Sequence, residues 1–288
     1  MKRNIVRIIK NLARMGRSDP RRLRRFVTSR VLIATGLSKH MVFQLGDIRL
    51  RFFPTRYCAD LWFPDIDIYA HCRLPFLREG GTVVDVGANM GVLSLVFRKY
   101  VGAQGRVYAY EPHPVTFTYL KENILLNGAD NIRAFNAAIG ESKRTVPLTR
   151  NRNDTQNFIT NDRQKGIEVS QETLDSVMND QGIDRIDLLK VDTEGYELRV
   201  FQGASNVLRR THVVIFEAIE DMCRRNNYGV ADVVQLLQES EFLIYTQRRA
   251  DGKFQPIDID CFVERPHLFA PDLLASKKPL KLDEIAWI

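Results

Sequence analysis

The segment Val83–Gly91 constrains the fold of this chain more than any other. Its first residues, Val83-Val84-Asp85-Val86, have the apolar composition of a buried strand. Gly87-Ala88-Asn89-Met90-Gly91 follow at once, and glycine and asparagine are the residues that best tolerate the left-handed backbone of a tight turn. A buried strand that turns tightly into a helix after an acidic residue is typical of nucleotide-type cofactor sites.

A second acidic residue follows the next predicted strand. Residues 106–110 form a short β-type run that ends in Glu111-Pro112, 26 positions after Asp85. A carboxylate at this place in a βαβ unit holds the two hydroxyls of a ribose. The interval exceeds the roughly 20 residues usual in dinucleotide folds, and the turn lacks a full Gly-x-Gly-x-x-Gly. Both departures favour an adenosine ligand without a pyrophosphate.

The chain resembles the FkbM family of S-adenosylmethionine-dependent methyltransferases in these motifs and in several later ones. The motifs, in order, are Val84–Gly91, Tyr110-Glu111-Pro112, Leu120-x-x-Asn123-x-x-x-Asn127, Thr173-Leu174-Asp175, Leu188–Glu197 and Gly203-Ala204. They span about residues 80–217. The resemblance implies S-adenosyl-L-methionine as cofactor and O-methylation of a hydroxyl on a sugar, glycolipid or secondary metabolite.

Strand and helix patterns alternate through most of the chain, which predicts a doubly wound α/β fold with a mostly parallel sheet. The resemblance implies that this is the seven-stranded, Rossmann-like methyltransferase sheet. We predict strands at 82–86, 106–110, 131–135, 186–191, 212–217, 241–246 and 259–264, the last two as an antiparallel edge hairpin. We predict helices at 91–100, 114–127, 196–209 and 230–239.

We divide the chain into four parts: a basic N-terminal segment (1–30), a cover for the cofactor edge (31–78), the methyltransferase domain (79–270) and a C-terminal tail (271–288). The cover is predicted to begin with a small hairpin at 41–53. Polar residues gather between Arg144 and Ser170, most densely at 149–157. They predict a loop suited to a hydroxylated ligand.

Positive charge is concentrated at the N-terminus. Residues 1–30 contain eleven Lys/Arg and one acid, so this segment is +10, whereas the whole chain is +7 and the remainder therefore −3. Apolar residues at helical spacing between Ile5 and Met15 predict a basic amphipathic helix that binds an anionic membrane surface or a partner, or else packs on the body or is solvated. Nucleic acid is not expected as a partner. The scattered cysteines and absence of a long apolar run indicate a cytoplasmic protein, at most peripheral to the membrane.

Six residues are candidates for cofactor binding. Asp85 is expected to organise the turn or contact the methionine end of the cofactor, and Gly87, Asn89 and Gly91 shape the turn itself. Glu111 is expected to accept the ribose hydroxyls, and Ala138, in the stretch after the third strand, to line the adenine or simply pack.

Three carboxylates are candidates for catalysis: Asp192, Glu194 and Glu217. Alkylation of an alcohol requires a base, and the carboxyl ends of parallel strands are where open α/β sheets bind ligands. Asp192 is the preferred base, with helix capping as its alternative role, and Glu194 or Glu197 is expected to pair with Lys190. A magnesium site made by Asp192, Glu194 and Glu217 is the less favoured interpretation, so we predict no metal.

Two other functions remain open. An NAD(P)-dependent oxidoreductase is disfavoured by Ala88-Asn89 in the glycine turn. A non-enzymatic membrane- or partner-binding protein on an inert scaffold is disfavoured because Glu111 and Gly87 are both present.

Overall fold

The computed structural model describes residues 28, 31–55, 58, 61, 72–150, 157–160 and 166–287. They belong to two compact units, one within residues 1–67 and the other within 68–288. The predicted amphipathic helix between Ile5 and Met15 lies outside the described residues, as do residues 151–156 of the polar run. The assignment of 31–78 as a cover for the cofactor edge stays a prediction.

The first unit contains the predicted hairpin. After the 3₁₀ helix η1 (Leu37–His40), β1 (Val42–Leu45) pairs antiparallel with β2 (Ile48–Arg51). Gly46 has φ of 61° at the two-residue turn, a conformation that glycine adopts without steric cost. Alternate residues of both strands are buried, as expected for strands with one apolar face.

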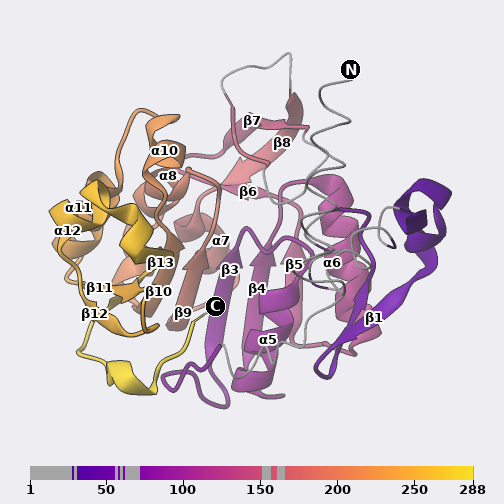
Figure 1. The fold of residues 1–288 in the computed structure, drawn as a ribbon, viewed down its shortest axis with the longest axis horizontal. Helices are drawn as coiled ribbons and strands as arrows, with labels where there is room; N and C mark the ends of the chain where they lie inside the picture. Colours follow the sequence, from indigo (N-terminus) through magenta and orange to yellow (C-terminus); the bar gives the residue numbers. More distant parts are fainter. Residues whose placement is uncertain are drawn as a thin grey trace, which may run out of the picture. The chain divides into compact units, whose positions relative to one another are not determined.

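The second unit is built on an eight-stranded sheet, whose strands run across Figure 1 from β12 and β11 to β5. In spatial order the strands are β12 (Phe254–Pro256), β11 (Leu243–Arg248), β13 (Phe269–Ser276), β10 (Thr211–Glu217), β9 (Ile186–Val191), β3 (Thr82–Val86), β4 (Arg106–Tyr110) and β5 (Ile132–Phe135). The five from β10 to β5 are parallel, and β13 and β12 run antiparallel to their neighbours. This confirms the predicted mostly parallel α/β sheet, to which the short edge strand β12 adds an eighth member.

The order in which the chain adds strands to the sheet reverses at its centre, between β3 and β9. The chain builds β3, β4 and β5 outward on one side and then returns to place β9 on the other side of β3. The loops after β3 and β9 therefore leave the sheet in opposite directions at the carboxyl ends of the strands, which is where open α/β sheets bind ligands. Both predicted sets of site residues begin at these strand ends.

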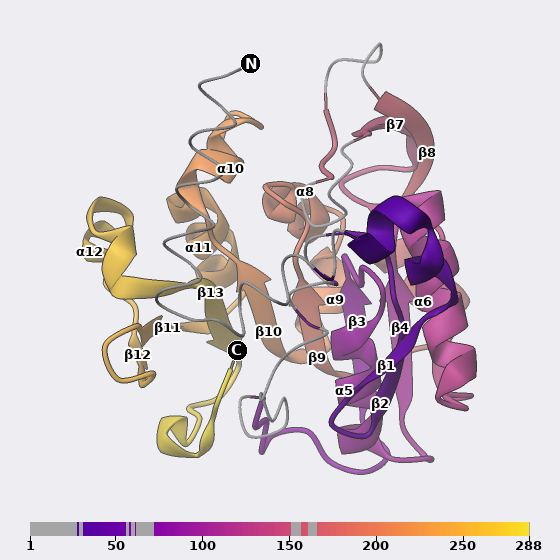
Figure 2. The ribbon, with the colours of Figure 1, turned by 45° about the vertical axis from the view of Figure 1, so that its right-hand side comes forward.

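Helices cover both faces of the sheet. Asp85 of β3 bonds to Ser94 of α5, whereas Val84 and Val86 face the opposite side and pack with apolar residues of α8, α9 and α11. In Figure 2, α5 and α6 stand at the β3–β4 end and α10, α11 and α12 at the β11–β13 end. The helices are α5 (Val92–Val101), α6 (Pro114–Leu126), α7 (Leu174–Asp180), α8 (Glu197–Gln202), α9 (Ser205–Arg209), α10 (Glu220–Arg224), α11 (Val230–Glu239) and α12 (Ile259–Glu264), with 3₁₀ turns η3 (Pro266–Leu268) and η4 (Leu282–Glu284). No helix in the described part of the chain has the length and apolar character needed to cross a membrane.

The prediction of a strand at 259–264 was wrong, because this segment is helix α12. Its β-branched and aromatic residues favour a strand, but Asp258 accepts a hydrogen bond from the amide of Cys261 and so caps a helix. The strand expected there is instead β13, which lies between β10 and β11 and includes residues we assigned to a C-terminal tail. Pro271 disfavours a strand because proline has no backbone N–H to donate. Its carbonyl still accepts a hydrogen bond from the amide of Ala218, which links the two segments.

Two further predictions need correction. The helix predicted at 196–209 is two short helices, α8 and α9, which meet at Gly203. A Cβ at Gly203 would lie 2.1 Å from the carbonyl oxygen of Gly140, so only glycine fits there. The polar segment predicted as a loop forms strands at both ends, β7 (Arg144–Thr149) and β8 (Gly166–Glu172), which join β6 (Ala138–Ile139) in a three-stranded sheet.

Candidate active site

The turn after β3 has the left-handed geometry that its sequence predicts. Gly87, Asn89 and Gly91 have φ of 78°, 51° and 87°. At Gly87 the neighbouring backbone also excludes a side chain, because a Cβ there would lie 1.8 Å from the carbonyl oxygen of Asp192. Likewise, a Cβ at Gly91 would lie 2.5 Å from Leu120. Both glycines are therefore required by close packing within the protein.

The backbone amides of this turn are already engaged. Those of Gly87 and Ala88 donate to the carbonyl of Tyr110, and that of Gly91 donates to Ala88. The amide of Asn89 donates to Oε2 of Glu111 (3.0 Å), and that of Met90 to the side chain of Asn89 (2.7 Å). A phosphate-binding loop needs free amides that point at the ligand. This turn therefore does not form a pyrophosphate cradle.

Glu111 lies at the end of β4, beside the turn, and is almost fully buried. Its Oε1 accepts the amide of His113 (2.8 Å), and its Oε2 accepts that of Asn89. These two bonds fix the carboxylate and tie the loop after β4 to the turn after β3. A carboxylate has about four acceptor positions, so it can accept further hydroxyls while keeping both bonds.

Asp85 is completely buried beneath the turn. Its Oδ2 accepts a hydrogen bond of 2.5 Å from Ser94 of α5, and its Oδ1 lies 3.6 Å from Nζ of Lys190. Burial raises the pKa of Asp85, and Lys190 and Ser94 oppose that shift. Asp85 thus anchors the start of α5 and balances the charge of Lys190 from inside the protein.

Lys190 joins the two predicted groups of site residues. Its ammonium donates to the carbonyl of Gly87 (3.2 Å) and to Oδ2 of Asp192 (3.2 Å), and it also faces Asp85. Burial lowers the pKa of Lys190, but the carboxylates of Asp192 and Asp85 raise it above its ordinary value overall. The lysine is therefore a fixed cation, paired with Asp192 and Asp85 rather than with Glu194 or Glu197.

Asp192 combines a fixed position with solvent access. Its amide donates to the carbonyl of Val86 (3.0 Å), and 42 % of its side chain is exposed although Lys190 beside it is buried. Tyr196, not Asp192, occupies the N-cap position of α8. The capping alternative for Asp192 is therefore wrong, and its carboxylate is partly exposed just beyond the carboxyl end of β9.

The turn after Asp192 is held by Glu197. This buried carboxylate accepts the amides of Thr193 (2.9 Å) and Gly195 (3.2 Å) and the hydroxyl of Thr193 (2.9 Å). Glu194 between them has a φ of 57°, which is unfavourable for a residue with a side chain. Burial, Asp192 and Glu197 raise the pKa of Glu194 to about 7.

Two further carboxylates extend the acidic site along the neighbouring strands. Glu217 ends β10 and stands opposite Asp272 of β13 in the antiparallel register. Burial, followed by the charges of Asp192 and Glu194, raises the pKa of Glu217 to about 9, and its Oε2 is buried without a hydrogen-bond partner among the described residues. Burial raises the pKa of Asp272 to about 6, against a hydrogen bond of 2.6 Å from Nε1 of Trp287.

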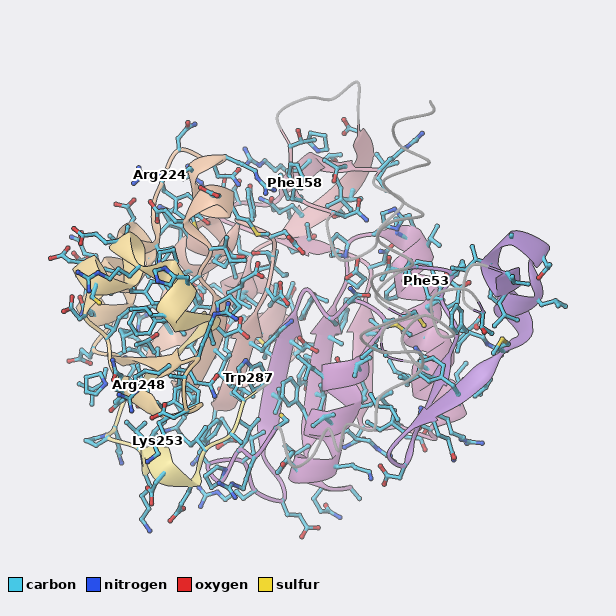
Figure 3. The ribbon with its side chains drawn as sticks, viewed as in Figure 1. Phe53, Phe158, Arg224, Arg248, Lys253 and Trp287 are labelled. Atoms are coloured by element: carbon cyan, nitrogen blue, oxygen red, sulfur yellow. The ribbon has the colours of Figure 1, made fainter. Side chains whose placement is uncertain are left out.

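The sequence reasoning missed Asp272 and Trp287, because both lie in the segment assigned to a tail. Trp287, labelled in Figure 3, is nearly buried and stacks on Phe97 of α5 with 6.4 Å between ring centroids. The sequence contained one signal for Asp272: it is an acidic residue within the mostly apolar segment Phe269–Ser276. The described residues contain no group of His, Cys, Asp or Glu arranged to hold a metal ion.

Ala138 packs within the protein, one of the two roles expected for it. It lies in β6, and its side chain is buried with Val146, Leu148 and Val169 in the core of the three-stranded sheet. Asn136, two residues earlier, is exposed and donates to the carbonyls of Glu111 (2.8 Å) and Pro112 (2.9 Å).

These residues fit S-adenosylmethionine, the cofactor that the resemblance implies. Glu111 supplies a fixed carboxylate for a ribose, and the engaged amides of the turn after β3 leave no cradle for a pyrophosphate. The acidic residues around Asp192 suit a cofactor that carries a sulfonium and an ammonium group. The donor and acceptor chemistry thus matches a cationic adenosine derivative better than an anionic dinucleotide.

Comparison with known proteins agrees with this geometry. A methyltransferase sdnD of Sordaria araneosa is 33 % identical over 168 residues, which cover 46 % of this chain and 64 % of that protein. The hexuronic acid methyltransferase AglP of Haloferax volcanii is 25 % identical over 171 residues, covering 57 % of this chain and 64 % of AglP. The chain thus spans less than two thirds of the length of these relatives.

Among solved structures, the methyltransferase FkbM of Methylobacillus flagellatus KT is similar to 73 % of this chain and 50 % of its own, with a TM-score of 0.46 and 16 % identity. The model of the methyltransferase FkbM domain matches residues 85–244, more than half of the sequence. That match begins at Asp85 and includes Glu111, Lys190, Asp192 and Glu217. The chain belongs to the FkbM methyltransferase family.

Proposed function

We propose that this protein is an S-adenosylmethionine-dependent O-methyltransferase that acts on a hydroxyl of a sugar, glycolipid or secondary metabolite. One observation carries the proposal: Lys190 joins the turn after β3, which leads to Glu111, to the exposed carboxylate of Asp192. The observation supports a cofactor position and a base at the ends of two adjacent strands, β3 and β9. The name of AglP, which refers to a hexuronic acid, supports a carbohydrate acceptor.

In this proposal the cofactor supplies an activated methyl group, and the protein supplies alignment and proton removal. Glu111 holds the ribose hydroxyls, and the turn 87–91 sets the position of the cofactor relative to the strand ends. Asp192 accepts the proton of the acceptor hydroxyl as the oxygen becomes a nucleophile. Lys190 orients Asp192 and is itself held from behind by Asp85.

Glu194 and Glu217 have a different part in the proposal. Their pKa values are raised to about 7 and about 9, so Glu217 is protonated at neutral pH and does not act as the base. They shape the acceptor side of the site and leave Asp192 as its base. The family resemblance supplies the substrate class.

Calorimetry with S-adenosylhomocysteine, NAD and NADP tests the cofactor assignment. We expect binding of S-adenosylhomocysteine alone, and the Glu111→Ala protein should bind it more weakly by about 1–3 kcal/mol, because a charged acceptor is lost. Asp130→Ala, which removes an exposed acid after α6, is the matched control and should bind normally. An unchanged affinity in Glu111→Ala would remove Glu111 from the ribose site, and binding of NAD in place of S-adenosylhomocysteine would overturn the proposed function.

We also propose that the protein is cytoplasmic and associates peripherally with the inner membrane surface through residues 1–30. The +10 charge of this segment against −3 for the rest of the chain supports the proposal. Membrane attachment would bring the enzyme to a lipid-linked acceptor.

A further inference from the structure

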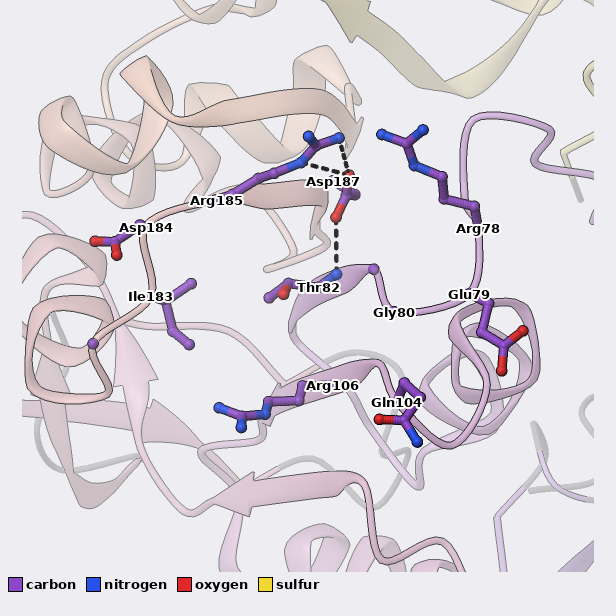
Figure 4. A pocket seen from close by; sticks show the side chains of 12 residues that line it. Arg78, Glu79, Gly80, Thr82, Gln104, Arg106, Ile183, Asp184, Arg185 and Asp187 are labelled. Atoms are coloured by element: carbon purple, nitrogen blue, oxygen red, sulfur yellow. Dashed lines mark hydrogen bonds and ion pairs between the residues drawn. The ribbon is translucent and has the colours of Figure 1, made fainter.

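A cleft lies at the edge of the sheet where the strands begin, opposite the edge that carries Asp192. It has a volume of about 500 Å³ and lies at the amino ends of β3, β4 and β9 (Figure 4). Three arginines, Arg78, Arg106 and Arg185, are among its lining residues. An adjoining cleft of about 210 Å³ shares Arg78 and Arg185 and adds His212 and Lys278. The two clefts together form one cationic surface, distinct from the acidic site at the carboxyl ends.

Asp187 fixes one of the arginines. Its Oδ1 accepts hydrogen bonds from Nε (3.0 Å) and Nη2 (2.7 Å) of Arg185, and its Oδ2 accepts the amide of Thr82 (2.9 Å). The side chain of Asp187 is 8 % exposed, whereas that of Arg185 is 51 % exposed. Both carboxylate oxygens of Asp187 thus accept hydrogen bonds, and these bonds fix the orientation of the Arg185 guanidinium. The remaining N–H groups of Arg185 face the cleft.

Arg78 approaches the same point from the other side. Figure 4 shows the guanidinium groups of Arg78 and Arg185 pointing toward one another, while the carboxylates of Glu79 and Asp184 point away from the gap. Within the described residues, Arg78 makes no side-chain hydrogen bond or ion pair. Two cations that face each other across a gap repel unless an anion lies between them.

Lys278 and His212 add to the positive field. The pKa of His212 is lowered, first by burial and then by the charges of Arg185, Lys278 and Arg78, which outnumber the opposing charge of Asp187. A histidine that is harder to protonate because of its neighbours reports an excess of positive charge. Positive charge remains in excess around His212 because the carboxylate of Asp187 is already paired with Arg185.

We propose that this cleft binds a phosphate group carried by a small molecule or a lipid headgroup, with Arg78, Arg185 and Lys278 as its ligands. A guanidinium fork matches phosphate oxygens in pairs, and a dianion neutralises two facing arginines at once. Phe76 and Leu280 line the adjoining cleft and give the organic part of the ligand an apolar wall. The site is independent of the proposed methyl transfer, because it lies at the other end of the strands.

Proton NMR of the full chain tests the site directly. Inorganic phosphate should raise the pKa of His212, whereas chloride at equal ionic strength should not, and His212→Gln identifies the resonance among the five histidines. Arg78→Gln should weaken phosphate binding about tenfold, the effect of losing one charged hydrogen-bonding partner. Arg265→Gln removes an equal charge from an exposed position elsewhere and should leave binding unchanged. An unshifted His212, or equal phosphate affinity in Arg78→Gln and wild type, overturns the proposal.

Two binding experiments distinguish the possible sources of the phosphate group. Phenyl phosphate represents a soluble phosphomonoester, and vesicles containing phosphatidic acid represent a lipid headgroup. Arg78-dependent binding in either experiment supports the site and identifies its source, whereas binding in neither experiment, or binding that is insensitive to Arg78→Gln, overturns it. Binding of S-adenosylhomocysteine, measured on the same variants, should stay at the wild-type level, so that a failure of the phosphate site is separated from a failure of the proposed function.

Discussion

The indole nitrogen of Trp287 donates a hydrogen bond of 2.6 Å to Oδ2 of Asp272. Trp287 is the penultimate residue of the chain, and Asp272 stands opposite Glu217 across β13 and β10. The chain end is held in place because Ala286 exchanges two backbone hydrogen bonds with Arg73. Trp287 therefore lowers the pKa of an acid whose charge acts on Lys190.

Trp287→Phe should raise the pKa of Asp272 further above about 6, because the indole bond favours the ionised form and phenylalanine keeps only the ring. We expect a loss of about 1–3 kcal/mol in the free energy of unfolding. Carboxyl NMR titration and denaturant unfolding measure the two effects. If the loss of stability came from packing alone, Asp272→Asn would not diminish the effect of Trp287→Phe in a double-mutant cycle.

Glu217→Gln should change how stability depends on pH. The pKa of Glu217 is about 9 in the folded protein, against an ordinary value of 4.5, so folding retains a proton between these pH values. The stability from this group is fully present below about pH 4.5 and is lost as pH rises through about 9. The variant should therefore gain melting temperature relative to wild type at about pH 8.5 compared with about pH 5. Glu239→Gln, at an exposed position on α11, is the control, and parallel pH profiles for Glu217→Gln and wild type would contradict the prediction.

Gly87→Ala should destabilise the protein by about 2–4 kcal/mol, since a Cβ with positive φ is unfavourable and this one would also meet the carbonyl of Asp192 at 1.8 Å. Gly128→Ala is a matched control: its φ is also positive, 54°, but nothing among the described residues lies within 4 Å of its Cβ. Chemical denaturation of both variants separates backbone strain from the contact. Equal losses in the two proteins would show that the approach of Asp192 is not a constraint.

Asp192→Asn should lower turnover by about 10²–10⁴ and leave the affinity for S-adenosylhomocysteine nearly unchanged, because a lost base affects the transition state more than the bound cofactor. Asp130→Asn is the control for a surface charge change. Methyl transfer and calorimetry on the same samples test this. Near-normal turnover in a folded Asp192→Asn protein would move the base to Glu194.

Deletion of residues 1–30 should release the protein from anionic vesicles without abolishing methyl transfer to a soluble acceptor. Each basic residue near such a surface contributes about 1 kcal/mol, an attraction that salt screens. Vesicle flotation measures this attraction when the full-length protein and the deletion variant are compared at low and high salt. Equal flotation of the two would show that the segment does not carry the attachment.

Much of the parallel part of the sheet is predictable from local sequence. Strands β3, β4 and β9 are mostly apolar because both faces of a central parallel strand are buried. Asn89 and the glycines around it indicate a left-handed turn, and Glu111 follows the next strand directly. The family motifs lie in this region, so the residue pattern by itself predicts the cofactor side of the site.

The antiparallel part of the sheet and the pairing of the site residues depended on contacts between segments that are distant in the sequence. Residues 259–264 and 269–276 have similar β-type composition, and only the cap at Asp258 and the gap between β10 and β11 decide which of them is a strand. Gly87 is required because Asp192, more than a hundred residues later, comes into contact with it. The sequence alone determined the strands, the turn and the acidic ends, because these follow from local burial and backbone preference. Tertiary structure decided which acid pairs with Lys190 and which acids stay protonated, because pairing and desolvation depend on neighbours that the chain brings together only on folding.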